Sequence, residues 1–237
     1  MAKTVVITQS NYIPWRGYFA MLRLADEVVL LDSVQYTRQD WRNRNTIKTS
    51  QGPAWLTIPV NIKGRYRQTI AETRIADPSW AATHIRSIEV AYRRAAHFEA
   101  AAPWVFERLR EVSDEALLAD VNRRLLRAFC DLLGIAVPLL RCIEVLDAQT
   151  LAEAGPTERL VKLAQARGAT TYLSGPAARE YLEVDAFESS GIEVAWMDYR
   201  GFAEYPQLWG GFEPSVSIVD LILNTGADAP RYLRREI

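Results

Sequence analysis

Short aliphatic runs separated by polar segments dominate the first part of the chain. TVVIT (4–8) and EVVLLD (27–32) are bounded by turn residues, which indicates strands buried on both faces, as in a parallel sheet. Between them, residues 17–26 place apolar side chains at helical spacing, so residues 4–32 predict a βαβ unit. Further strands are indicated at residues 54–60, 137–143, 170–175 and 192–198.

Helical periodicity dominates the middle of the chain. Helices are predicted at residues 79–95, 103–112, 113–134, 157–168 and 215–226. Ser79 is a favoured N-cap residue, and Gly134 is the residue type that ends helices. Strands that alternate with helices indicate one α/β domain over residues 1–237, with a mainly parallel, Rossmann-like sheet. Residues 79–134 are expected to form an inserted helical lid or subdomain.

Composition sets limits on the partners. Hydrophobic residues make up 49% of the 237 positions and charged residues 24%, as in ordinary globular proteins. A formal net charge of -1 gives no overall field to hold nucleic acid, so neither DNA nor RNA is expected as a partner, and any anion must bind locally.

Cysteine usage and hydropathy point to the cytoplasm. Cys130 and Cys142 lack the C-x-x-C spacing of a zinc site or redox motif, which fits a reducing compartment. The N-terminus does not resemble a signal peptide, and no apolar run reaches the ~20 residues of a membrane span. Walker A, G-x-G-x-x-G and H-E-x-x-H motifs are also missing, so no metal is expected.

Polar and aromatic residues crowd the ends of several predicted strands. The residues concerned are Gln9, Asn11, Tyr12 and Trp15 after the first strand, Asp32 and Gln35 at the second, and Ser174 and Gly175 at a later one. Open parallel sheets bind ligands at the carboxyl ends of their strands. We therefore expect these groups to face one crevice.

The segment 32–48 is the densest polar stretch. Basic residues Arg38, Arg42, Arg44 and Lys48 alternate there with Trp41, Asn43 and Asn45. Guanidinium groups match carboxylate and phosphate oxygens, and an indole adds a stacking surface. An anionic ligand fits: a nucleotide sugar, a phosphopantetheine arm or a lipid-linked sugar. The alternative is a solvated basic loop balanced by two aspartates.

Two further segments carry candidate site residues. On a helix, His84 shares a face with Ile88 and lies near Tyr92, so it is either a general base or a hydrogen-bonded core imidazole. The stretch 198–214 is rich in Tyr, Trp, Gly and Pro and holds Gln207. Such aromatic loops suit sugars, but they also serve as packed covers.

Several of these segments together resemble one family. They are Q-x-x-Y-x-P-W-x-G-Y-F (9–19), D-x-V-Q (32–35), W-R-N-R-N-x-I (41–47), W-L-T-I-P-V (55–60), H-I-x-x-I-x-x-x-Y-x-x-A (84–95), Y-L-S-G (172–175) and S-I-V-D-L-I-L-N-T-G (217–226). In this order they are similar to the WbqC-like proteins. The resemblance implies a place among bacterial surface polysaccharide (O-antigen) proteins, regarded as candidate acyl or aminoacyl transferases. Ser10 stands where the family usually has Pro, and Cys142 where it often has Ser, which argues against a cysteine nucleophile.

The first loop also resembles another group of enzymes. A strand, then P-W-x-G-Y, then a helix is laid out like the H-x-G-H loop of nucleotidylyltransferases, with Trp15 and Tyr18 in place of the histidines. S-G-P-A-A-R (174–179) is similar to their phosphate-binding S-S-T-x-x-R segment. This implies a shared nucleotide-binding architecture, but the missing histidines put nucleotidyl transfer by the usual route in doubt.

Together these features predict a transferase that adds an acyl or aminoacyl group to an amino sugar. His84 would be the general base, and Arg42 and Arg44 would bind the anion or oxyanion. An acyl thioester of coenzyme A or a carrier protein would be the co-substrate, with no permanently bound cofactor. The alternatives are a nucleotide-dependent ligase or nucleotidylyltransferase-like enzyme, and a non-catalytic nucleotide-sugar binding protein. The oligomeric state is left open.

Overall fold

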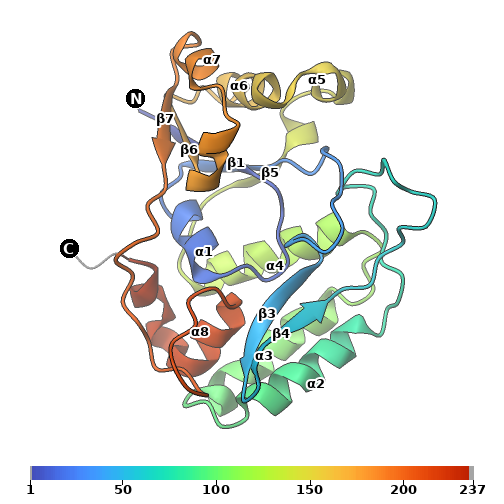
Figure 1. Cartoon of the computed structure of the whole chain (residues 1–237), viewed down its shortest axis with the longest axis vertical. Coiled ribbons are helices and arrows are strands. Elements are labelled where there is room, and N and C mark those ends of the chain that lie inside the picture. Colours follow the sequence, from blue (N-terminus) through green and yellow to red (C-terminus); the bar gives the residue numbers. More distant parts are fainter. Residues whose placement is uncertain (1, 235–237) are drawn as a thin grey trace.

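The structure is a computed structural model of the chain and describes residues 2–234. Within these residues a five-stranded sheet and a two-stranded hairpin are surrounded by helices (Figure 1). The strands are β1 (Thr4–Thr8), β2 (Glu27–Leu30), β3 (Arg44–Thr49), β4 (Gly52–Thr57), β5 (Leu139–Arg141), β6 (Thr171–Ser174) and β7 (Glu193–Trp196). The α-helices are α1 (Arg16–Leu22), α2 (Trp80–Tyr92), α3 (Phe98–Glu111), α4 (Leu118–Leu132), α5 (Ala148–Glu153), α6 (Pro156–Ala166), α7 (Val184–Glu188) and α8 (Ile218–Thr225). The 3₁₀ helices are η1 (Cys142–Glu144), η2 (Pro176–Glu180) and η3 (Gly226–Leu233).

The larger sheet has the strand order β5-β2-β1-β6-β7, and every neighbouring pair is parallel. The chain starts at the central strand β1, moves outward through β2 to β5, and then returns to build β6 and β7 on the other side. The order therefore changes direction between β1 and β6. This is a Rossmann-like α/β fold, as the sequence predicts, and it has one topological switch point.

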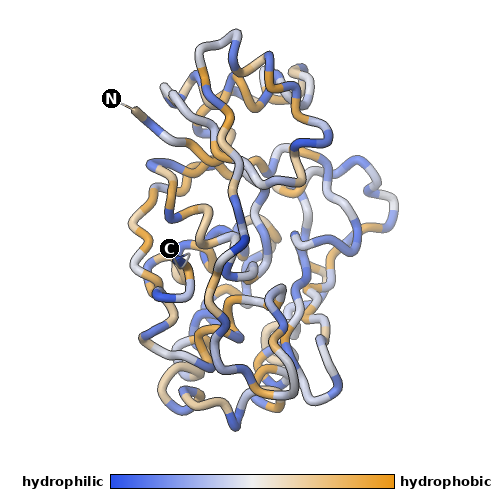
Figure 2. Tube along the Cα trace, turned by 60° about the vertical axis from the view of Figure 1, so that its left-hand side comes forward, coloured by the Kyte–Doolittle hydropathy of each residue, from blue (hydrophilic) through white to orange (hydrophobic). Residues whose placement is uncertain are grey.

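The central strands are buried on both faces. Val6 and Val28 belong to a hydrophobic cluster with α1, α4 and α8, whereas Val5, Ile7 and Val29 belong to a second cluster with α5, α6 and α7. Figure 1 places the second group of helices above the sheet and α1 and α4 below it. Figure 2 shows hydrophobic and hydrophilic residues alternating along the helices, as expected for helices with one buried side.

A long excursion joins β2 to its neighbour β5 and contains the hairpin and α2, α3 and α4. In α4, Leu118, Val121, Leu125 and Phe129 are buried at helical spacing, which explains why this helix is readable from the sequence. The hairpin is different. Its first strand, β3, overlaps the segment interpreted from the sequence as a ligand loop. The strand was not predicted because its residues RNTIKT place polar side chains at buried positions.

Within the described residues, no helix is long and apolar enough to cross a bilayer. Cys130 is fully buried in α4, and burial raises the pKa of its thiol to about 12, so it acts as a small core residue.

Candidate functional site

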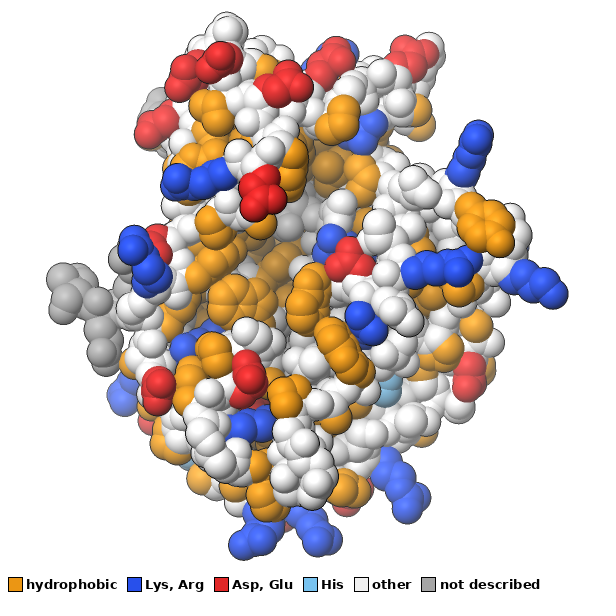
Figure 3. All heavy atoms as spheres, in the orientation of Figure 1, with side chains coloured by type: hydrophobic (Ala, Val, Ile, Leu, Met, Phe, Trp, Pro, Cys, Tyr) orange, Lys and Arg blue, Asp and Glu red, His pale blue; other side chains and the backbone are white. Residues whose placement is uncertain are grey.

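A cleft of about 580 Å³ opens where the carboxyl ends of β1 and β6 meet the segment after β2. It lies at the switch point of the sheet, where open parallel sheets bind their ligands. Figure 3 shows a hollow on this face of the molecule, bordered by hydrophobic side chains. The lining residues are Ile7, Thr8, Gln9, Asn11, Trp15, Tyr18, Met21, Leu31, Val34, Trp41, Arg42, Pro156, Arg159, Leu160, Tyr172, Leu173, Ser174, Gly175, Pro176, Ala177, Ala178, Tyr181 and Tyr199.

Buried polar groups fix the loop between β1 and α1, which forms one side of the cleft. The side-chain amide of Asn45 donates to the carbonyl oxygens of Tyr12 (3.1 Å) and Ile13 (3.0 Å). The Ser217 hydroxyl donates to the same Ile13 carbonyl at 2.7 Å. Ile13 has a φ of 34°, which a β-branched residue adopts only when its surroundings impose it. These hydrogen bonds provide that constraint.

Trp15 stands in the cleft wall because Gly17 leaves room for its ring. A Cβ atom on Gly17 would lie 2.3 Å from the indole, far inside van der Waals contact. The ring of Tyr199, from the segment after β7, packs on Trp15 with 4.9 Å between ring centroids. The wall of the cleft thus joins residues from the two ends of the chain.

Among the described residues that line the cleft, two arginines are the only charged side chains. Arg42 donates to the side-chain oxygen of Asn11 and lies 3.5 Å from an oxygen of Asp40, and Arg159 donates to the Ala154 carbonyl at 2.8 Å. Both Nε atoms are buried and have no hydrogen-bond partner in the described part of the chain. Asp40 partly balances the charge of Arg42, and the terminal nitrogens of the two guanidinium groups can donate to an anion in the cleft.

The phenols in the cleft are neutral hydrogen-bonding groups. Burial raises the pKa of Tyr172 and of Tyr199 to about 12, so both stay protonated near neutral pH. The Tyr18 hydroxyl donates to the Gln9 carbonyl at 2.9 Å. Ser174 is nearly buried at the end of β6 and lines the cleft beside Tyr172. The cleft therefore offers donors and aromatic surfaces.

His84 lies in the core, away from the cleft lining. Its Nδ1 is 2.8 Å from the Tyr12 hydroxyl, and its Nε2 is 3.1 Å from the Thr57 carbonyl oxygen. Burial lowers the pKa of His84 to about 4, and the Thr57 hydrogen bond opposes this only in part. The expected convergence of His84 with the arginines is not found, because both ring nitrogens are already engaged inside the protein.

Several other predicted residues also serve the interior. The side chain of Tyr12, in the loop between β1 and α1, is fully buried, and the Asn43 amide donates to the Ile58 carbonyl at 2.9 Å. The Tyr92 hydroxyl donates to Asp220 at 2.8 Å, and Gln207 donates to the other oxygen of that carboxylate, also at 2.8 Å. Burial raises the pKa of Asp220, which these donors partly counteract. None of the four predicted residues lines the cleft.

The remaining predicted residues, Asp32, Gln35, Arg44 and Asn45, do not line the cleft either. Asp32 is buried, accepts the Ser10 backbone N–H at 2.9 Å, and has a pKa raised by burial. Gln35 is exposed and donates to the Tyr66 carbonyl at 2.7 Å. Arg44 stacks its guanidinium 4.0 Å from the centre of the Trp55 ring. The predicted residues that do meet in the cleft are Gln9, Asn11, Trp15, Trp41, Arg42, Ser174 and Gly175.

Comparison with known proteins identifies the family of this chain. Residues 9–232 match the WbqC-like protein family. The chain belongs to that family. It is 50% identical over 232 residues to "Uncharacterized protein Rv1507c" of Mycobacterium tuberculosis (strain ATCC 25618 / H37Rv), a match that covers 98% of each chain. No solved structure gives a significant match.

Sequence reasoning missed part of the cleft of this WbqC-like chain. Arg159 and Tyr199 line it, as does Tyr181. A signal for two of them was present. Arg159 lies in the first turn of the helix that leads into β6, and Tyr199 follows the end of β7, both positions expected near the carboxyl edge of a parallel sheet.

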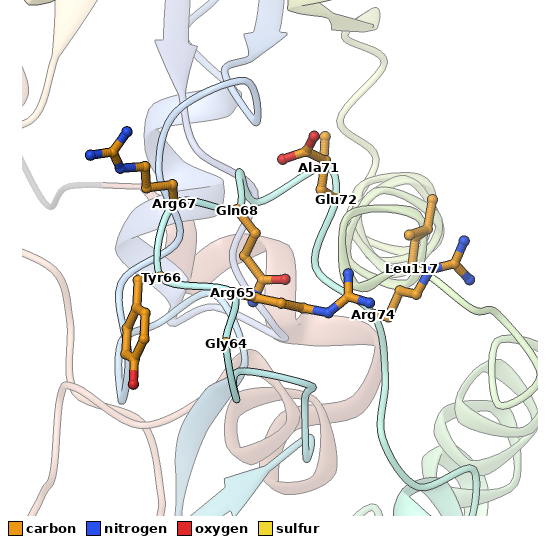
Figure 4. Close-up of a pocket in the computed structure, with 9 residues that line it drawn as sticks. All are labelled: Gly64, Arg65, Tyr66, Arg67, Gln68, Ala71, Glu72, Arg74 and Leu117. Atoms are coloured by element: carbon orange, nitrogen blue, oxygen red, sulfur yellow. The ribbon is translucent and has the colours of Figure 1, made fainter.

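A second hollow, of about 820 Å³, is formed by the loop that follows the hairpin, together with Leu117. Figure 4 shows that its arginines Arg65, Arg67 and Arg74 point in different directions instead of toward one centre. The loop is largely exposed, which fits a solvated basic surface better than a ligand site. No group of three or more His, Cys, Asp or Glu among residues 2–234 is arranged to hold a metal ion.

Proposed function

We propose that this WbqC-like protein is a transferase that binds a nucleotide-linked amino sugar in the cleft and adds an acyl or aminoacyl group to it, in the synthesis of bacterial surface polysaccharide. One observation carries the proposal. The cleft at the switch point is lined by Arg42 and Arg159 without any Asp, Glu, His or Lys among the described lining residues, and aromatic rings surround them.

The two arginines suit a diphosphate. A guanidinium group presents parallel N–H donors that match phosphate oxygens, and it keeps its charge at any relevant pH. Because the chain has a net charge of only -1, the positive potential needed for an anionic ligand must come from the cleft itself. A volume of about 580 Å³ is in the range of ordinary small-molecule sites.

Acyl transfer from a thioester fits a cleft without a general base. The amine nitrogen of the sugar attacks the thioester carbonyl carbon, and the C–S bond breaks. The departing thiolate takes up the proton that the nitrogen loses, so no protein nucleophile is consumed. Holding the two substrates together supplies much of the rate enhancement. Arg42 or Arg159 would stabilise the oxygen that carries negative charge in the tetrahedral intermediate.

A non-catalytic nucleotide-sugar binding protein is the second candidate. It is favoured by the position of His84, because the residue predicted as the base is hydrogen-bonded on both nitrogens in the core. Such a protein would bind the same ligands but would form no product with any acyl donor.

Calorimetry with UDP, dTDP and GDP tests the binding step. Arg42→Gln and Arg159→Gln should each weaken binding of the preferred diphosphate about tenfold or more, because each removes a charge-assisted contact. Arg65→Gln is the matched control, since this arginine lines the exposed hollow instead, and it should leave the affinity unchanged. Equal effects of all three substitutions, or no binding at all, would contradict the proposal.

Turnover separates the two candidates. The protein is mixed with UDP- or dTDP-linked amino sugars and acetyl coenzyme A or an acyl carrier protein, and products are detected by mass spectrometry. An N-acylated sugar nucleotide that is lost in Arg42→Gln supports the transferase. Tight binding without product supports the binding protein.

A further inference from the structure

Two indoles form an exposed pair at the mouth of the cleft. Trp41 is 43% exposed and Trp55 is 47% exposed, and their ring centroids are 5.5 Å apart with an angle of 42° between planes. Trp41 also lines the cleft, whereas Trp55 does not. The pair therefore continues the cleft outward along one side.

Trp55 is not part of the hydrophobic core. It is on the outward side of β4, opposite Thr46, while the next residue, Leu56, is buried in the core. A strand places alternate side chains on opposite faces, so the side chain of Trp55 points away from the core that Leu56 joins. Large exposed aromatic groups that are contiguous with a cleft mark binding surfaces.

Arg44 holds the outer indole in place. Its guanidinium lies 4.0 Å from the centre of the Trp55 ring, a close cation–π contact. The Arg44 Nε is buried and has no hydrogen-bond partner among the described residues. With the arginine packed on it, Trp55 presents a fixed apolar surface beside Trp41, which lowers the entropic cost of stacking a ligand there.

We infer that Trp41 and Trp55 form a stacking platform for the sugar ring of the nucleotide-linked substrate. This assignment rests on the proposed function. A pyranose ring has an apolar face of C–H groups that packs on an indole, while its hydroxyl groups remain in water. Arg42 is the neighbour of Trp41 in the chain and lines the cleft. One short segment thus offers a contact to the diphosphate and a contact to the sugar.

The test compares each nucleoside diphosphate with its sugar derivative. The pairs are UDP with UDP-N-acetylglucosamine, dTDP with dTDP-glucose, and GDP with GDP-mannose. In the unmodified protein at least one sugar derivative should bind more tightly than its diphosphate. Trp55→Ala should weaken the affinity for that sugar derivative about tenfold, as expected for loss of one stacking contact. The affinity for the diphosphate should change by less than about twofold. Trp55→Phe should restore part of the difference.

Tyr66→Ala is the matched control. Tyr66 is 71% exposed and carries Arg38 at 5.4 Å from its ring centre, but it belongs to the second hollow instead of the cleft. The Tyr66→Ala variant should bind both the diphosphate and its sugar derivative as tightly as the unmodified protein does. Equal affinities for diphosphate and sugar derivative in the unmodified protein, or equal losses of both in Trp55→Ala, would overturn the platform while leaving the diphosphate cleft in place. Failure of every diphosphate to bind would overturn the proposed function, and the platform with it.

Discussion

At the scale of single residues, the segment around the cleft divides into side chains that face the ligand space and side chains that hold the backbone behind it. Trp41 and Arg42 line the cleft, whereas Asn43 and Asn45 donate to backbone carbonyls in the interior. His84 belongs to the second group and links the first loop to β4 through Tyr12 and Thr57. Buried polar groups of this kind fix a conformation because leaving them unpaired is costly.

The burial of His84 makes stability depend on pH. Its folded-state pKa of about 4 lies below the ordinary value of 6.5, so between these values the unfolded chain binds more protons. The contribution of His84 to the free energy of unfolding is complete above the ordinary pKa of 6.5 and is lost as the pH falls toward the folded-state pKa of about 4. Between about pH 7 and about pH 4.5 we expect a loss of about 2–3 kcal/mol.

Urea unfolding at both pH values, compared with His84→Gln, measures this contribution, because the glutamine does not titrate. The unmodified protein should lose more unfolding free energy than the variant over the same interval. Identical pH dependence of the two proteins would contradict a neutral, buried imidazole.

The residue types of the cleft were predictable, but the direction in which each side chain points was not. Residues at the ends of β1 and β6, and Trp41 and Arg42 of the W-R-N-R-N segment, line the cleft. Asn45 and Arg42 have the same polar appearance in the sequence, yet one faces the core and the other the cleft. Arg42 lies in the turn before β3, whereas Asn45 is inside this strand, whose four central residues are all buried although three of them are polar.

At the scale of elements, the irregular segment 197–217 acts as a strap between β7 and α8. It surrounds Arg16, the first residue of α1: the guanidinium lies 5.3, 5.3 and 5.2 Å from the ring centres of Phe202, Tyr205 and Phe212. The same side chain donates to the Ala203 carbonyl at 2.6 Å. Because α1 begins beside the cleft, this contact connects the strap to the cleft wall.

Arg16→Lys should loosen the strap. An ammonium group keeps the charge but lacks the planar surface that packs among three rings, so we expect a loss of about 1–3 kcal/mol in unfolding free energy. Limited proteolysis should also become faster within residues 197–217. Arg86→Lys, at an exposed position on α2, serves as the control and should change neither property. Unchanged proteolysis in Arg16→Lys would argue against the anchoring role.

Elements with a strong apolar period were predictable, and those without one were not. β1 spans the predicted residues, and α4 lies inside the predicted helix. The short helices α5 and α7 were missed because six and five residues are too few to establish a helical period. The strand predicted at residues 54–60 corresponds to β4 (Gly52–Thr57), but its partner β3 was not predicted.

At the scale of the whole molecule, one sheet serves two hydrophobic cores. Neighbouring residues of the same strand, such as Val5 and Val6, belong to opposite clusters. Neither core can lose its packing without exposing the strands that the other one covers. We therefore propose that the chain, its long helical excursion included, unfolds as one cooperative domain.

Phe187→Ala tests this cooperativity from one side of the sheet. Phe187 is fully buried in the second cluster and stacks on Tyr172 with 4.7 Å between ring centroids. Truncation of this side chain should lower the free energy of unfolding by about 3–5 kcal/mol. Tryptophan fluorescence, which includes Trp80 in the first cluster, and far-ultraviolet circular dichroism should shift together to a lower melting temperature.

Val90→Ala, at an exposed position, should leave both melting curves where they are. Two separate transitions in Phe187→Ala, with the tryptophan signal unshifted, would instead indicate that the two cores unfold independently.

The smallest residue of the first helix sets the position of one of the largest side chains in the molecule. Gly17 contributes no atoms to the cleft lining, yet the space above its Cα is filled by the indole of Trp15. A side chain at position 17 would force the indole to shift, and the shift would change the shape of the cleft wall. The shape of the cleft wall therefore depends on a position without a side chain.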